Sequence, residues 1–416
     1  RMFLVFPFIF FMAFFAFSQS KNQYLRKYRL DLNFECPEFN KGMLLVGFGA
    51  LHGSAKTEAA ELKLFRCAIN AHGLDYYTME TDYGTAHYFN EYLESGDTVL
   101  LRDLVYHYGF TVPQERTEEV YMKWKELRKI RMKIPKEQRF RVLGIDEIHS
   151  HKYSLVLLRD ILQRVPEFDT HLMENLFDLI ALASADEKAH SVTKAFREKL
   201  NGLMQNWETA EKGHISAQNK KLTDYLMLNI NNTLKKTVLT RDEIMYQNYC
   251  ALDSVFGIQN KKVFARLGFF HLEKTREMEY PSFFSLIIEN KIYEKSQVKS
   301  VLGYLTKSQV LWDVDYDQEE KTLTFTTEKG YGISDYWLER FKGIRFLKKN
   351  KLSDLTLFDL GKQESPYHNA KVNLVQINYL FKKSIGRPFR HKVTTEFLDY
   401  ALLISESRNA SPLRIQ

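Results

Sequence analysis

The chain has 416 residues, a hydrophobic fraction of 44% and a formal net charge of +7. This much apolar material can build a sizeable core, so the composition excludes a globally disordered chain. The basic residues are spread along the chain and form no basic run with interleaved aromatics, so we expect no nucleic-acid partner.

The first residues are typical of a secretory signal peptide. Arg1 precedes an unbroken apolar stretch from Met2 to Phe17, and Ala16 and Ser18 are small residues of the kind that a signal peptidase reads. The stretch is shorter than the roughly 20 residues of a membrane span, and an uncleaved anchor is the alternative. We therefore expect a signal peptide over residues 1–18 and an exported chain, periplasmic or secreted, without stable membrane insertion after cleavage.

The three cysteines, Cys36, Cys67 and Cys250, are too few and too scattered to predict a disulfide framework. Cys67 falls on the apolar side of an expected helix, where we interpret it as a packing residue. No Cys-x-x-Cys pair indicates a metal site.

The chain first alternates between strand and helix patterns. Residues 42–48 read as a buried strand, and apolar residues at helical spacing follow from Thr57. A second strand is expected over residues 75–79. A strand, a helix and a strand at this spacing form a βαβ unit, whose right-handed crossover makes the two strands parallel.

Further strands are expected over residues 140–145 and 262–267, with helix-forming sequence over residues 115–133 and 240–256. Residues 153–236 read as amphipathic helices without a strand run, which is too long for a simple crossover. We interpret this block as a helical insertion, about residues 150–236, that covers the carboxyl edge of the sheet.

Residues 309–315 and 321–327 read as a β-hairpin joined by an acidic turn. The sequence therefore predicts a single α/β domain over residues 19–416. It combines a mostly parallel central sheet flanked by helices, a large helical insertion and a C-terminal mixed segment with a hairpin.

Two Gly-x-x-His sequences, Gly49 to His52 and Gly268 to His271, each follow an expected buried strand. A glycine at a strand end lets the chain turn sharply, so each histidine can point off the end of the sheet. Glu80 and Asp146 also fall at the carboxyl ends of expected strands. Ligands and reactants of open α/β sheets bind outside that edge, so we expect these four side chains to share a crevice.

Histidine suits proton transfer near neutral pH, and a carboxylate at the end of an apolar strand needs a partner. We expect His52 or His271 to be the partner of Glu80. Because no Gly-x-Ser-x-Gly elbow is present, water is the expected nucleophile.

Each of these residues also has a purely structural interpretation. A single histidine after a strand is more often a packed side chain than a functional one. Asp146 can cap a helix, and Asp82 and His87 can line the crevice or begin a helix. Arg241 can belong to a charge arrangement at the N-terminus of a helix and have no other role.

Several motifs resemble the erythromycin esterase-like family in order and spacing over roughly residues 42–275. They are His52-Gly53-Ser54, the Lys63-containing run Leu62–Phe65, Glu80, Asn90-Glu91-Tyr92, Gly96, Gly144-Ile145-Asp146, the arginine helix Arg241–Asn248 and the strand that ends in His271. The resemblance implies that His52 is a general base on water, Glu80 an orienting carboxylate and His271 an assisting histidine. Lys63, Asp82, His87, Asp146 and Arg241 are the candidate substrate-binding residues.

The chain departs from the family pattern at two places. Gly49 stands where the first motif usually has glutamate, and Gly268-Phe269 replace the usual His-Asn of the last motif. The same pattern is similar to a wider superfamily with Tiki-type metalloproteases and haem-uptake lipoproteins. That resemblance implies that His52, Glu80 and His271 could instead hold a divalent metal.

The sequence thus predicts an exported hydrolase that cleaves an ester or related acyl bond of a small molecule, without a cofactor, by histidine-activated water. The helical insertion would form the walls of its substrate cleft. Two alternatives stay open: a ligand-binding member of the same fold without catalysis, and a metal-dependent peptidase or hydrolase.

Overall fold

The computed structural model describes residues 20–39, 42–165, 170–185, 194–209, 215–234, 239–277, 279–317, 322–328, 332–380, 389 and 391–414. The expected signal peptide, residues 1–18, lies outside these ranges. Among the helices within them, none has the length and apolar character needed to cross a bilayer.

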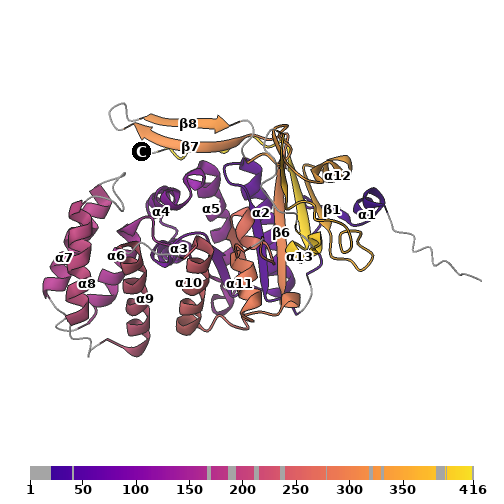
Figure 1. Ribbon diagram of the computed structural model, residues 1–416. Helices are drawn as coiled ribbons and strands as arrows, with labels where there is room; N and C mark the ends of the chain where they lie inside the picture. The colour runs from indigo at the N-terminus through magenta and orange to yellow at the C-terminus, as the bar shows by residue number, and fades with distance from the viewer. Residues whose placement is uncertain are drawn as a thin grey trace, which may run out of the picture.

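An eight-stranded sheet forms the centre of the molecule (Figure 1). In spatial order its strands are β1 (Arg29–Asp31), β10 (Leu355–Asp359), β12 (Tyr400–Ser405), β6 (Val298–Thr306), β2 (Leu45–Ala50), β5 (Val263–Leu267), β3 (Tyr76–Met79) and β4 (Arg141–Gly144). The six strands from β12 to β4 run parallel, and β10 and β1 extend the sheet antiparallel at one edge. The predicted fold class, a mostly parallel sheet flanked by helices, is confirmed.

Helices cover both faces of this sheet. Those of the main body are α1 (Lys21–Lys27), α2 (Ala55–His72), α3 (Tyr83–Ser95), α4 (Thr98–Thr111), α5 (Glu118–Met132), α10 (Arg241–Phe256), α11 (Phe283–Glu289), α12 (Ile344–Lys349) and α13 (Thr394–Phe397), with short 3-10 helices η1 (Pro113–Glu115), η2 (Lys136–Gln138), η3 (Phe269–Leu272) and η4 (Lys295–Gln297). Helix α10 begins at a capping box in which Thr240 and Glu243 satisfy each other's backbone N–H groups.

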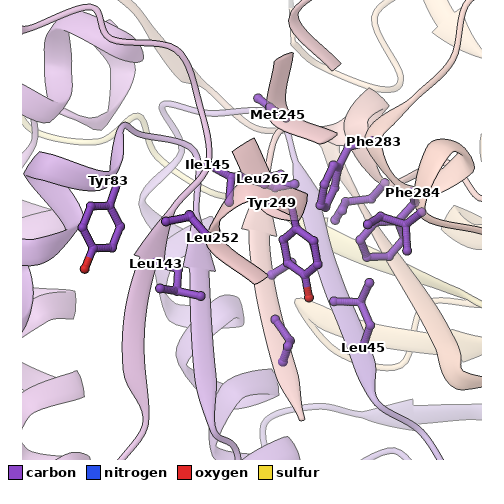
Figure 2. Packing of buried hydrophobic residues seen from close by; sticks show 14 of the residues in the cluster. Leu45, Tyr83, Leu143, Ile145, Met245, Tyr249, Leu252, Leu267, Phe283 and Phe284 are labelled. Atoms are coloured by element: carbon purple, nitrogen blue, oxygen red, sulfur yellow. The ribbon is translucent and has the colours of Figure 1, made fainter. Parts of the chain in front are cut away.

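The hydrophobic core is split by the sheet into two layers. On one face α10 and α11 bury Tyr249, Leu252 and Phe283 against strand residues such as Leu45 and Leu143 (Figure 2). On the other face α2 and α5 pack against alternate residues of the same strands. Because both faces are buried, the central strands read as continuous apolar runs in the sequence.

The helical insertion consists of α6 (His151–Leu162), α7 (Thr170–Ala185), α8 (Lys194–Thr209) and α9 (Ala217–Leu234). These helices pack on one another and reach the rest of the chain mainly through α3 and α10, so they extend the molecule beyond the β4 edge (Figure 1). That they wall a substrate cleft stays a prediction.

The predicted hairpin is present as β7 (Val310–Asp317) and β8 (Thr322–Glu328), and β9 (Glu339–Phe341) pairs with β11 (Ile377–Tyr379). The hairpin lies against the residue after His52, where the Leu311 N–H donates to the Gly53 carbonyl at 2.8 Å. Gly53 has a φ of +87°, and a Cβ there would lie 2.1 Å from the Leu311 carbonyl oxygen. Only glycine fits at this contact.

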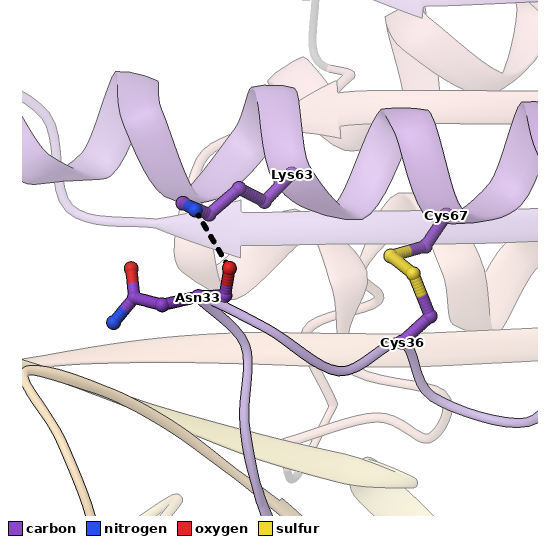
Figure 3. Close-up of a disulfide and its surroundings, with 4 residues drawn as sticks. All are labelled: Asn33, Cys36, Lys63 and Cys67. Carbon is purple, nitrogen blue, oxygen red and sulfur yellow. Dashed lines mark hydrogen bonds between the residues drawn. A yellow bond between two sulfur atoms is a disulfide. The ribbon is translucent and has the colours of Figure 1, made fainter.

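Cys36 and Cys67 form a disulfide that ties the N-terminal segment to α2 (Figure 3). The interpretation of Cys67 as a packing residue was wrong, because the segment before β2 passes close to this helix. Lys63 lies on the same helix and donates to the carbonyl of Asn33 at 3.4 Å (Figure 3).

Candidate active site

His52 leaves the carboxyl end of β2 and is held from behind by a buried glutamate. Its Nδ1 forms a short hydrogen bond with Oε1 of Glu115, the last residue of η1. The Glu115 side chain is 1% exposed, whereas that of His52 is 15% exposed. Its Nε2 faces Glu80.

Glu80 follows β3 and joins the two histidines. Its Oε2 accepts from the Gly268 N–H at 2.5 Å and lies 3.5 Å from Nε2 of His52. Its Oε1 lies 2.9 Å from Arg241 and 3.6 Å from Nε2 of His271. Both imidazoles therefore approach one carboxylate, although the two histidines are 219 positions apart in the chain.

Gly268 lies between the two histidine rings. A Cβ at this position would be 3.2 Å from Cδ2 of His271 and 3.5 Å from Nε2 of His52. The glycine of the second Gly-x-x-His sequence thus lets the backbone approach both rings and donate to Glu80.

His271 lies on η3, directly after β5, and has a carboxylate behind it as His52 does. Its Nδ1 is 2.8 Å from Oδ1 of Asp242, in the first turn of α10. The same oxygen accepts from the Phe283 N–H at 2.6 Å, so it is fixed from two sides. The His271 side chain is 15% exposed.

Arg241 closes the site on the side of β4. Its guanidinium binds both carboxylate oxygens of the buried Asp146, and Nη2 also reaches Glu80. Asn248 donates from α10 to the carbonyls of Ile145 and Asp146, which fixes the turn after β4. Asp146 therefore positions Arg241, and Arg241 positions Glu80.

Beneath His52 lies a group of five buried charged residues, which we name the ion cluster: Glu58, Glu61, Glu115, Lys123 and Arg266. Lys123 lies 2.5 Å from Glu58 and 2.8 Å from Glu61. Arg266 lies 3.1 Å from Glu61 and 3.4 Å from Glu115. Because the members are almost inaccessible to solvent, each charge depends on its partners.

The carboxylates set the charges of the two histidines. Burial opposes the charge on His271, but the hydrogen bonds and negative charges of Asp242 and Glu80 outweigh it and raise its pKa to about 10. Burial also opposes protonation of His52, and the hydrogen bond and charge of Glu115 raise the pKa of His52 above its ordinary value.

The two carboxylates themselves are ionised. Burial would raise the pKa of Glu80, but Arg241 and the two histidines hold it well below its usual range. Glu115 behaves alike: its bond to His52 outweighs burial and lowers its pKa to about 2.

The structure brings His52, Glu80, His271, Asp146 and Arg241 together, as expected from their places at the strand ends. Their chemical roles stay predictions. The structure does not bring the three other candidates to this site.

Lys63 lies more than two turns along α2 and contacts the N-terminal segment (Figure 3). Asp82 is the N-cap of α3 and accepts from Thr85 and Ser154, so its helix-starting interpretation holds. His87 lines a cavity beside Arg141, at the amino-terminal end of β4, because the helical period turns it away from the two histidines.

Three residues that contact the histidines were not among the predicted site residues: Glu115, Arg266 and Asp242, which the sequence offered only as part of the arginine helix. Glu115 was placed in a helix over residues 115–133, but α5 begins only at Glu118, after the N-cap Thr117. Pro113 and Thr117 together marked a break there that would have separated Glu115 from the helix.

The arrangement does not fit the alternative of a metal held by His52, Glu80 and His271. No group of three or more His, Cys, Asp or Glu side chains within the described residues is placed to hold an ion. Both oxygens of Glu80 already face donors, the Arg241 guanidinium and the Gly268 N–H. A cation here would compete with Arg241 and with two histidines whose pKa values are raised.

No family model and no curated protein matches this chain. Solved structures do. A protein of Bacillus cereus is similar with a TM-score of 0.64 at 14% identity, covering 94% of this chain and 98% of that chain. A succinoglycan biosynthesis protein is similar with a TM-score of 0.58 at 13% identity, covering 95% and 98%.

A mutant of erythromycin esterase EreC in its open conformation is similar with a TM-score of 0.57 at 14% identity, covering 90% of this chain and 93% of that chain. At these identities the similarity shows the fold alone. The chain therefore has the fold of erythromycin esterase over nearly its whole length.

Proposed function

We propose that this protein is an exported hydrolase of the erythromycin esterase-like superfamily that cleaves an ester or related acyl bond of a small molecule. The observation that carries the proposal is the pair of histidines, each backed by a carboxylate and both facing Glu80. The shared fold supports the superfamily. The Cys36–Cys67 disulfide and the apolar leader support export to an oxidising compartment.

His52 is the base in this proposal. Glu115 accepts a hydrogen bond from Nδ1–H of His52. In the neutral ring the lone pair is therefore on Nε2, the nitrogen that faces Glu80. Nε2 takes a proton from a water molecule, and the water oxygen attacks the acyl carbon. The buried Glu115 fixes the orientation of the ring and stabilises the imidazolium that forms.

His271 is the acid. Its pKa of about 10 keeps it charged at neutral pH, with Nδ1–H donated to Asp242 and Nε2–H directed into the crevice. From Nε2 it stabilises the oxyanion of the tetrahedral intermediate and then protonates the leaving oxygen. Glu80 orients both rings, and Arg241 keeps Glu80 ionised.

This assignment predicts a bell-shaped pH dependence of kcat/KM. Activity rises as His52 loses its proton, above its ordinary pKa, and falls as His271 loses its proton near pH 10. The optimum should therefore be alkaline.

The test uses the purified full chain with a panel of aryl esters and lactones. Turnover should fall by about 10³-fold in His52→Gln, while His72→Gln, a histidine bonded to Phe39 far from the crevice, should retain it. Equal turnover by the wild type and His52→Gln would eliminate His52 as the base.

A second candidate function is ligand binding without turnover. The observation that favours it is the raised pKa of both histidines, which together with Arg241 favours a negatively charged ligand beside them. A carboxylate-bearing ligand retained by the wild type, with no turnover of any ester on the panel at pH 7 to pH 10, would support it.

A further inference from the structure

A cavity lies at the amino-terminal end of the edge strand β4. It has a volume of about 370 Å³ and is enclosed by α3, α6, α9 and the end of α10. Two of its residues are Arg141, the first residue of β4, and Phe256, the last of α10. Since α10 begins at Arg241 in the crevice and has 16 residues, its length separates the two sites by about 24 Å.

Two guanidinium groups face this cavity without a carboxylate partner. Arg141 lies over the ring of Phe256 at 4.4 Å and is 3.4 Å from the Tyr83 hydroxyl. Arg164 is exposed at the end of α6. Within the described part of the chain, no Asp or Glu oxygen lies within 4.0 Å of either guanidinium.

One of the two acidic residues of the cavity already has partners. Asp160 lines the cavity, but its carboxylate accepts from both Nε and Nη2 of Arg159 and from the Tyr88 hydroxyl at 2.6 Å. Glu91, exposed at the rim, is the other lining carboxylate, so two arginines without a carboxylate partner face one remaining carboxylate and the balance favours an anion.

His87 adds a buried ring nitrogen without a partner, while its Nε2 lies 3.9 Å from Oε1 of Glu91. Its Nδ1 is shielded from solvent and forms no hydrogen bond with any described residue. Burial, with the charges of Arg141 and Arg164, lowers the pKa of His87 to about 4, so the ring is neutral at pH 7. A buried nitrogen without a partner is costly, and a bound ligand would relieve that cost.

We propose that this cavity binds a small organic anion, a carboxylate or phosphate carried on an aromatic ring. Arg141 and Arg164 bind the anionic group, and the ring packs on Phe256 and the neighbouring apolar side chains of the cavity. The volume suits a small molecule. This site is separate from the proposed hydrolase crevice and does not depend on its activity.

The test is calorimetric titration of the full chain with phenyl phosphate, benzoate and the neutral benzamide. At least one anion should bind, and benzamide should bind at least about tenfold more weakly. Arg141→Met should weaken anion binding by about tenfold and Arg164→Gln by several-fold. The tighter of the two anions identifies the preferred charged group.

Two controls keep the result specific. Arg345→Met removes an exposed arginine that also lies over a phenylalanine ring, Phe346 at 5.0 Å, and should leave binding unchanged. Arg164→Gln changes a surface side chain only, so its effect does not depend on refolding of the core.

The proposal is overturned if neither anion binds the wild type at millimolar concentration. It is equally overturned if Arg141→Met and Arg164→Gln both bind as the wild type does. Binding that is lost in Arg241→Gln but kept in both cavity variants would assign the anion to the crevice instead.

Discussion

The two histidines have matching contacts but different surroundings. Each places Nδ1 on a carboxylate and Nε2 towards Glu80, and each side chain is 15% exposed. Behind His52, however, lies the ion cluster, whose Arg266 is 3.4 Å from Nδ1. Behind His271 lie Asp242, in the first turn of α10, and the Phe283 N–H at the start of α11.

This difference gives two chemically identical rings different tendencies to hold a proton. The positive charge of Arg266 opposes protonation of His52, whereas Asp242 and Glu80 both favour protonation of His271. The same side chain can therefore serve as a base at one position and as an acid at the other, according to the groups behind it.

Arg266→Met should have the largest effect, because it removes a positive charge from the buried ion cluster behind His52. Arg266 is 2% exposed, and its loss leaves Lys123 as the one cation of the ion cluster beside its three carboxylates. We expect the free energy of unfolding, measured by urea denaturation, to fall by roughly 3–5 kcal/mol. The exposed Arg345→Met should change it by less than about 0.5 kcal/mol. A loss from Arg266→Met as small as the control's would mean that the ion cluster does not stabilise the fold.

Glu115→Gln tests the carboxylate behind His52 without changing its shape. The amide oxygen can still accept from Nδ1, but the negative charge that raises the pKa of His52 is lost. We expect kcat/KM to fall by about 10²-fold and its acid limb to move to lower pH. Glu126→Gln, which removes an exposed carboxylate paired with Arg66, should leave both unchanged. An unmoved acid limb would show that Glu115 does not tune His52.

The parallel half of the fold was predictable because its signals are local. β2, β3, β4 and β5 are short apolar runs bounded by glycine or charged residues, and each was expected within a few residues of its observed place. The polar residue after each strand then followed from the rule that parallel strands present their carboxyl ends at one edge.

The C-terminal strands of the sheet and the carboxylates behind the histidines were not predictable, because they depend on distant pairings. β10 (Leu355–Asp359) and β12 (Tyr400–Ser405) carry apolar runs, but only pairing with β6 and β1 places them in the sheet. Glu115 and Asp242 show no pattern of their own. Each becomes a site residue only because a histidine more than 25 positions away turns towards it.

The pH dependence of the free energy of unfolding tests the raised pKa of His271. Because the pKa of His271 is raised to about 10 in the folded chain, its stabilisation is complete below its unfolded pKa near 6.5 and disappears as the pH rises through 10. We expect the free energy of unfolding to lose roughly 3–4 kcal/mol more between pH 7 and pH 10 in the wild type than in His271→Gln. Parallel curves for the two proteins, measured by urea denaturation at each pH, would refute the raised pKa.

Asp242→Asn should have the smallest effect. It replaces the carboxylate beside His271 with a neutral amide. The asparagine oxygen keeps a hydrogen-bond acceptor beside Nδ1, but the charge that raises the pKa of His271 is removed. The alkaline limb of kcat/KM should then move towards neutral pH, and activity at pH 9 should fall by about tenfold. Glu243→Gln, in the same turn of α10, removes a charge that pairs with the Thr240 backbone and not with His271. Because both substitutions weaken the start of the helix, a shift of the alkaline limb in Asp242→Asn alone would identify the contact with His271, and not the helix, as its cause.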